Sequence, residues 1–107
     1  KELENYCDVP LVPEKTKSAW AQYTIQTNNR KKVLEYLQEK NIPTAIYYPI
    51  PMHLQPAYKK YHKKSSNMTN SLKLSKSVFS IPIHPYLKEN QKEYIIKSIK
   101  GAIKDAR

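Results

Sequence analysis

The sequence predicts an α+β domain with a small antiparallel-type sheet of about three strands and helices on one face of that sheet. Segment 19–26 alternates apolar and polar residues with a period of two, which is typical of a strand. Segments 30–40 and 89–104 instead carry apolar residues at helical spacing. The chain of 107 residues fits one domain of ordinary size with one modest core.

The N-terminal residues 1–18 are expected to be the end of a helix followed by a connector, because two prolines interrupt regular structure there. The opening letters KELENY begin as if within a helix, which suggests a piece of a longer protein. The strand over 19–26 follows, and either Asn28 or Asn29 can cap the next helix.

The helix over 30–40 is amphipathic, with charged residues around an apolar side. That apolar side consists of Val33, Leu34 and Leu37. Asn41 follows at the position where helices often end in left-handed backbone, which Asn tolerates best after Gly. Pro43 then favours an extended chain, and residues 44–48 predict a second strand because they are rich in β-branched and aromatic side chains.

The rest of the chain alternates loops with regular elements. Prolines in the segment after residue 48 predict a loop, and the basic residues 58–66 predict one helical turn and an exposed loop. The remaining elements are a short helix that Thr69 or Asn70 can cap and that runs to about residue 77, with Leu74 and Val78 facing inward, and a helix over 89–104. Between them lies a strand over 78–83 that Pro82 ends or places at a sheet edge.

The composition narrows the function classes. The net charge of +10 favours anionic partners, although lysines spread along a chain are more typical of a solvated surface. The single Cys7 predicts an incidental thiol in a reducing cytoplasm, and a single glycine leaves no glycine-rich phosphate loop. Neither a metal site nor a membrane span is expected, because His53, His62 and His84 lack ligand spacing and no apolar run is long enough.

The most unusual segment is IYYPIPMHLQPAY, residues 46–58, which is uncharged in a strongly charged chain. Its prolines lower the conformational entropy of the loop, so Tyr47, Tyr48, His53 and Gln55 can be held ready for a polar ligand. Hydroxyls, an imidazole and an amide offer hydrogen bonds, and tyrosine rings can stack on a base or sugar. A purely structural loop that covers the sheet edge is the alternative.

Three blocks in order resemble the C-terminal part of the DegT/StrS-type sugar aminotransferases. They are SAWAQYTIQ, the helix end KNIPTAIYYPIPMHLQPAY, and LSKSVFSIPIHPYLKENQKEYIIKSI. The resemblance covers roughly residues 18–100 and implies the small domain of the aspartate-aminotransferase fold. Residues 1–18 would then connect to a missing large domain, and residues 19–107 would be the C-terminal small domain.

The resemblance also implies a pyridoxal-phosphate enzyme that moves an amino group, with glutamate as donor, onto a nucleotide-linked keto sugar. The residues of these blocks most resemble family members that act on UDP-linked acetamido sugars in surface-polysaccharide synthesis. No lysine here matches the cofactor-lysine motif, so the cofactor would be held by the large domain and the chain alone would not catalyse. In the family, the loop matching Tyr47 to Gln55 reaches an active site at a homodimer interface and helps to hold the nucleotide sugar.

This sequence departs from the family pattern at several positions. Tyr47 stands where many members have His, whereas Tyr48, His53 and Gln55 match, so a charge-assisted phosphate contact from position 47 is in doubt. Asn41 replaces the usual glycine, and Lys88 replaces a usual Ser or Thr cap, which predicts a less well capped last helix. The block containing Pro82, His84 and Pro85 is taken as structural.

Two other functions remain open from the residues alone. A basic nucleic-acid-binding module is favoured by the charge, Trp20 and nine tyrosines, but lysines and aromatics do not interleave on one predicted sheet face. A protein-interaction module is the third possibility. Under the aminotransferase hypothesis, no nucleic-acid, membrane or metal partner is expected.

Overall fold

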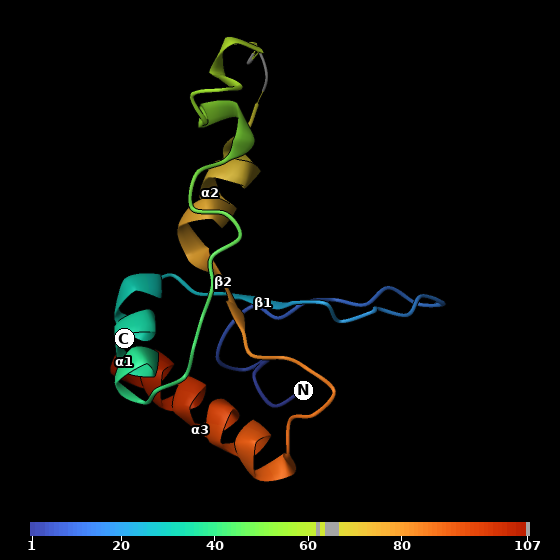
Figure 1. The fold of residues 1–107 in the computed structure, drawn as a ribbon, viewed down its shortest axis with the longest axis vertical. Helices are drawn as coiled ribbons and strands as arrows, with labels where there is room; N and C mark the ends of the chain where they lie inside the picture. The colour runs from blue at the N-terminus through green and yellow to red at the C-terminus, as the bar shows by residue number, and fades with distance from the viewer. Residues whose placement is uncertain (62, 64–66, 107) are drawn as a thin grey trace.

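The computed structural model describes residues 1–61, 63 and 67–106. His62, one of the three histidines considered above as metal ligands, lies outside these residues, as does part of the loop predicted over 58–66. The elements run in the order β1 (Tyr23–Gln26), α1 (Arg30–Glu39), η1 (Met52–Leu54), η2 (Lys59–Tyr61), α2 (Thr69–Ser77), β2 (Val78–Ile81) and α3 (Glu89–Asp105), where η marks a 3-10 helix (Figure 1).

The sheet consists of β1 and β2, which pair antiparallel with Ile25 opposite Phe79 and Thr24 opposite Ser80. Because side chains alternate along a strand, Ile25 and Phe79 share one face, and both are fully buried. On the other face the hydroxyls of Thr24 and Ser80 lie 2.8 Å apart and share a hydrogen bond. The α+β class and the antiparallel sheet are therefore confirmed.

The expected number of about three strands is wrong, because the described residues form a sheet of two. Residues 44–48, predicted as the second strand in chain order, make a single bridge, in which Ala45 and Ser80 exchange two backbone hydrogen bonds. Pro43 and Pro49 flank this point, and proline cannot donate to a ladder, so the pairing does not extend. The first strand is also shorter than 19–26, since Trp20 has left-handed backbone (φ 49°) and regular pairing starts at Tyr23.

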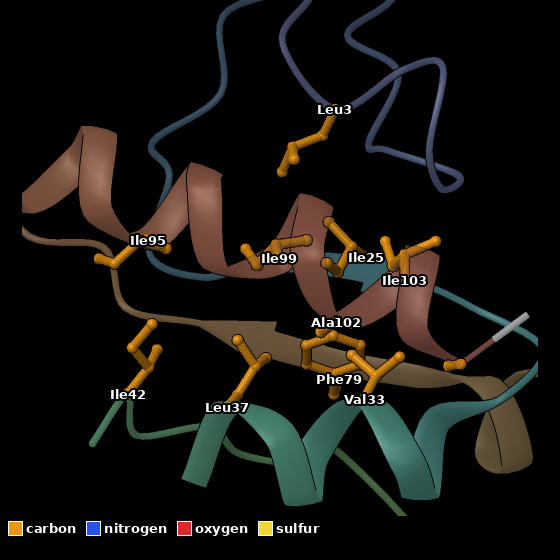
Figure 2. Close-up of a cluster of buried hydrophobic side chains, with 11 residues drawn as sticks. Leu3, Ile25, Val33, Leu37, Ile42, Phe79, Ile95, Ile99, Ala102 and Ile103 are labelled. Carbon is orange, nitrogen blue, oxygen red and sulfur yellow. The ribbon is translucent and has the colours of Figure 1, made fainter. Parts of the chain in front are cut away.

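The core lies between the sheet and two helices. Helices α1 and α3 contact each other, and side chains from both converge on the sheet face that carries Ile25 and Phe79 (Figure 2). The helix residues in this core are Val33 and Leu37 from α1 and Ile95, Ile99, Ala102 and Ile103 from α3. Leu3 also packs here and is buried, although residues 2–6 form turns and not a helix. The division into a connector (1–18) and a domain (19–107) stays a prediction.

The end of α1 has the left-handed residue that the sequence predicted. Asn41 has a φ of 56°, and its N–H donates to the Gln38 carbonyl at 2.9 Å. The N–H of Ile42 donates to the Leu37 carbonyl, also at 2.9 Å, which completes a Schellman motif. Ile42 and Leu37 both belong to the buried core, so this helix end joins backbone hydrogen bonds to apolar packing.

Two local expectations about helix ends have different outcomes. Asn29 is the N-cap residue of α1, but its side chain makes no cap bond and instead donates to the Ala106 carbonyl. The weaker cap of α3 is confirmed in part: the Lys88 side chain accepts nothing, but the Gln91 side-chain oxygen accepts the Lys88 N–H at 2.9 Å.

Helix α2 does not bury the face that the sequence predicted. Leu74 is exposed, whereas Ser75 and Ser77 are buried near the junction with β2. The reason is visible in Figure 1, where α2 and the loop before it extend away from the body that contains α1, α3 and the sheet. We call residues 46–61, 63 and 67–77 the lobe. The radius of gyration is 15.7 Å, against about 13 Å for a compact chain of this length, which agrees with such an extension.

Candidate functional site

The uncharged segment predicted as a ligand loop starts where the chain leaves the sheet at Ala45. Prolines prevent regular pairing, and the chain folds back through the short helix η1. Within this turn the Leu54 N–H donates to the Pro51 carbonyl at 2.9 Å, and the side-chain amide of Gln55 donates to the Ile50 carbonyl at 3.3 Å. The segment is thus held by local hydrogen bonds as well as by its prolines.

Three of the four predicted ligand residues lie around one cavity. Tyr47, Tyr48 and Gln55 line a cavity of about 210 Å³. The rings of Tyr47 and Tyr48 meet edge to face, with centroids 5.6 Å apart. Tyr47 is 45% exposed and Tyr48 is 68% exposed, so each offers its hydroxyl and part of its ring to a ligand or a partner.

His53 does not line this cavity. It lies on η1 and is half-buried. The structure therefore brings together Tyr47, Tyr48 and Gln55 but leaves His53 outside the group. The functional roles of all four residues stay predictions.

The opposite wall of the cavity comes from residues that the sequence analysis did not select. They are Ser71, Leu74 and Ser75 of α2 and Val78 of β2. The spacing of three and four between these positions indicates that they share one side of a helix. The sequence does not show that this side, with the start of β2, lies against residues 47–55. Ser71 and Ser75 add hydroxyl groups to the tyrosines and the amide across the cavity.

The charge distribution also separates the lobe from the body. None of the nine acidic residues lies between Lys40 and Lys88, whereas six lysines lie within residues 59–76 of that stretch. The lobe itself carries Lys59, Lys60, Lys63, Lys73 and Lys76. No carboxylate of the lobe can therefore repel an anionic ligand, and the surrounding lysines favour one.

The lobe also exposes many large side chains to solvent. Its exposed apolar and aromatic residues are Tyr47, Tyr48, Ile50, Met52, Leu54, Tyr58, Tyr61 and Leu74. Contiguous exposed apolar surface is typical of contact with a partner or with another domain.

The cofactor that the family resemblance implies does not fit the residues of this chain. A lysine that forms a Schiff base needs a desolvated or otherwise tuned setting. Among the described residues every lysine is exposed except Lys100, which is half-buried and paired with Glu2 at 2.6 Å. No step of the chemistry can be assigned to a lysine here.

Other reactive groups in the described residues do not form a second site. No cluster of three His, Cys, Asp or Glu side chains that could hold a metal is found in the described part of the chain. Burial raises the pKa of the Cys7 thiol to about 11, which makes it a weak nucleophile. His84 accepts the Tyr86 N–H at its Nδ1 and so shapes the turn before α3. No helix in the described ranges is both long and apolar enough to cross a membrane.

The fold and the cavity define a small α+β domain with an aromatic cavity on a protruding lobe that carries no acidic residue. A sequence model of the DegT/DnrJ/EryC1/StrS aminotransferase family matches residues 1–100. The chain belongs to this family.

Individual relatives agree with this assignment. A pleiotropic regulatory protein of Geobacillus stearothermophilus is 37% identical over 78 residues, which cover 73% of this chain and 21% of the relative. A UDP-2-acetamido-2-deoxy-3-oxo-D-glucuronate aminotransferase of Pseudomonas aeruginosa is 36% identical, with the same coverage. More distant relatives from Streptomyces venezuelae and Aneurinibacillus thermoaerophilus, 27% and 28% identical, are named as transaminases of dTDP-linked amino sugars.

A solved structure shows the same fold. A DegT/DnrJ/EryC1/StrS aminotransferase from Brucella abortus superposes with a TM-score of 0.89 and 41% identity over 94% of this chain and 27% of that one. The present chain thus spans about a fifth to a quarter of the length of these relatives.

Proposed function

We propose that this chain acts as the C-terminal, substrate-binding part of a longer pyridoxal-phosphate-dependent aminotransferase that aminates a nucleotide-linked keto sugar. The observation that carries the proposal is the cavity, where Tyr47, Tyr48 and Gln55 meet on an acid-free lobe in a member of this family. The short span of the chain relative to its relatives supports a role as one part of a longer enzyme. None of the lysines in the described ranges has a setting suited to the cofactor, so the chain alone is expected to be inactive.

The substrate class follows from the chemistry of the lobe. A nucleotide-linked sugar combines a base, hydroxyl groups and a diphosphate. Exposed tyrosine rings suit stacking on the base or sugar, and hydroxyl and amide groups suit hydrogen bonds to the sugar. The absence of carboxylates between Lys40 and Lys88 suits the diphosphate.

The finer assignment is a UDP-linked acetamido sugar, with glutamate as the amino donor, in surface-polysaccharide synthesis. It is supported by the name of the Pseudomonas aeruginosa relative, which is more similar to this chain than the relatives named for dTDP-linked sugars. A homodimer is part of the proposal, because the exposed apolar and aromatic side chains of the lobe need a surface to contact.

The test uses the longer enzyme, loaded with pyridoxal phosphate and supplied with glutamate. It compares a UDP-linked acetamido keto sugar with a dTDP-linked keto sugar and detects the amino sugar by mass spectrometry. Tyr48→Ala and Gln55→Ala are expected to raise the KM for the sugar about tenfold, since each removes a hydrogen-bonding group. Tyr86→Ala is the matched control, because Tyr86 is 85% exposed and lies in the turn before α3, away from the cavity.

Two outcomes would overturn the proposal. If the cavity variants have the same KM as the control, the loop does not bind the sugar. If the chain instead binds single-stranded nucleic acid with micromolar affinity that falls steeply with salt, the nucleic-acid-binding module is the better description.

A further inference from the structure

Arg30 is the first residue of α1 and belongs to the body, yet its side chain reaches the base of the lobe. One guanidinium nitrogen, Nη1, donates to the Ser75 carbonyl at 2.6 Å and to the Val78 carbonyl at 3.0 Å. The side chain is half-buried. Hydrogen bonds from a charged donor are stronger than neutral ones, and burial limits competition from water.

The place that Arg30 contacts is a junction without a linker, because α2 ends at Ser77 and β2 begins at Val78. The last carbonyls of a helix have no partners within the helix. Here the Ser75 carbonyl accepts from Arg30, and the Ser77 carbonyl accepts the Thr27 N–H at 3.0 Å. The positive charge of Arg30 also lies at the negative end of the α2 dipole. Groups of the body therefore fix the direction in which α2 leaves the sheet.

The two residues that Arg30 holds are themselves walls of the candidate site. Ser75 and Val78 line the cavity opposite Tyr47 and Tyr48, whereas Arg30 does not line it. The tyrosine wall is attached to the body at a different point, through the paired backbone hydrogen bonds of Ala45 and Ser80. The width of the cavity thus depends on two separate attachments, and Arg30 supplies one of them.

We propose that Arg30 is a positioning residue that sets the width of the cavity and thereby the affinity for the sugar substrate. The proposal rests on the proposed function, since it assumes that the cavity binds the nucleotide-linked sugar. Arg30 acts through α2 and touches neither the substrate nor the cofactor. It should therefore change the sugar half of the reaction and leave the glutamate half unchanged.

The kinetic test compares three variants of the longer enzyme. Arg30→Ala removes both hydrogen bonds and should raise the KM for the nucleotide-linked sugar about tenfold, with the rate of the glutamate half-reaction unchanged within twofold. Arg30→Lys keeps the charge and a donor nitrogen on a shorter side chain, so it should recover part of the loss. Lys31→Ala removes the neighbouring exposed charge and should leave both half-reactions unchanged.

A second measurement does not depend on turnover. Hydrogen exchange should become faster in residues 69–77 of Arg30→Ala, while the amides of α3 keep their protection. Unchanged exchange in the lobe would overturn the proposal, as would an unchanged KM in an enzyme that aminates the sugar. Equal losses in both half-reactions, or faster exchange in α3 as well, would show general destabilisation and would also overturn it. If the wild-type enzyme does not aminate the sugar, the proposed function fails, and the exchange pattern still decides whether Arg30 orders the lobe.

Discussion

Substitution of Asn41 tests the helix end that joins α1 to the core. Asn41 has a φ of 56°, a conformation that is unfavourable by about 1–2 kcal/mol for most residues with a Cβ atom and less so for Asn. Asn41→Ala should therefore lower the free energy of unfolding by about 1 kcal/mol. Asn41→Gly should leave it unchanged or raise it by up to about 0.5 kcal/mol, because relief of strain is partly offset by the greater freedom of Gly in the unfolded chain.

Thermal and urea unfolding of the purified chain, followed by circular dichroism, would measure this order. A loss of about 1 kcal/mol corresponds to a fall in Tm of about 5 °C for a domain of this size. Gln38→Ala is the matched control, because its backbone carbonyl still accepts the Asn41 N–H and the exposed side chain is not involved. If Asn41→Ala is as stable as Asn41→Gly, the left-handed conformation does not determine the stability of this helix end.

Three further predictions concern single groups. Burial raises the pKa of Cys7 to about 11, so about one thiol in a thousand is ionised at pH 8. The rate of alkylation by iodoacetamide should therefore still be increasing at pH 10. The stability that the neutral thiol contributes is complete below about pH 8.5 and is lost as the pH rises through 11. A rate that levels off by pH 9.5 would contradict this. A Cβ atom at Gly101 would lie 2.9 Å from the Tyr36 hydroxyl, so Gly101→Ala should stabilise α3 by about 1 kcal/mol in a Tyr36→Phe background and by less in the wild type, as urea unfolding of the four proteins would show. Tyr47→His in the longer enzyme should tighten nucleotide-sugar binding below about pH 6.5, where imidazole becomes charged, and should not change cofactor binding; equal changes in separate titrations of the two ligands would indicate a scaffolding role.

The helices could be predicted from the sequence because their signals are local. The expected helices over 30–40 and 89–104 differ by one residue at an end from the observed α1 and α3. The second helix begins at Thr69 with Met68 as its N-cap residue, so the expected cap at Thr69 or Asn70 is wrong by one or two residues. Each has apolar residues at helical spacing, or a cap and a break within a few residues. The left-handed Asn41 was predictable for the same reason, since it needs only a helix end followed by a proline.

The pairing of segment 44–48 could not be predicted, because it depends on contacts far apart in the sequence. Its composition suits a strand, but only Ala45 meets Ser80 before the chain turns into the lobe. The prediction that Leu74 faces inward was wrong for a related reason. An apolar residue at helical spacing predicts burial, yet among residues 1–61, 63 and 67–106 no core covers Leu74.

The candidate site could likewise be predicted only in part. Proline and tyrosine composition was enough to select residues 46–58, and the structure brings Tyr47, Tyr48 and Gln55 to one cavity. The wall formed by Ser71 and Ser75 comes from a helix more than a dozen residues further along the chain. Periodicity alone does not show which side of α2 faces the loop.

Under the proposed function, the charge pattern gives a physical reason why a tyrosine can stand at position 47, where the resemblance implies a histidine. A tyrosine at this position cannot supply a positive charge to a phosphate group at neutral pH. The lobe carries lysines and no acidic residue, so it attracts an anion without a charge at position 47. Such attraction acts over about one Debye length and is screened by salt, whereas a buried hydrogen-bonded contact is screened much less. Position 47 is 45% exposed, so a charge there is itself screened. Under the proposed function, nucleotide-sugar affinity should therefore fall as the salt concentration rises, and Tyr47→His at low pH, which adds a positive charge, should make that fall steeper.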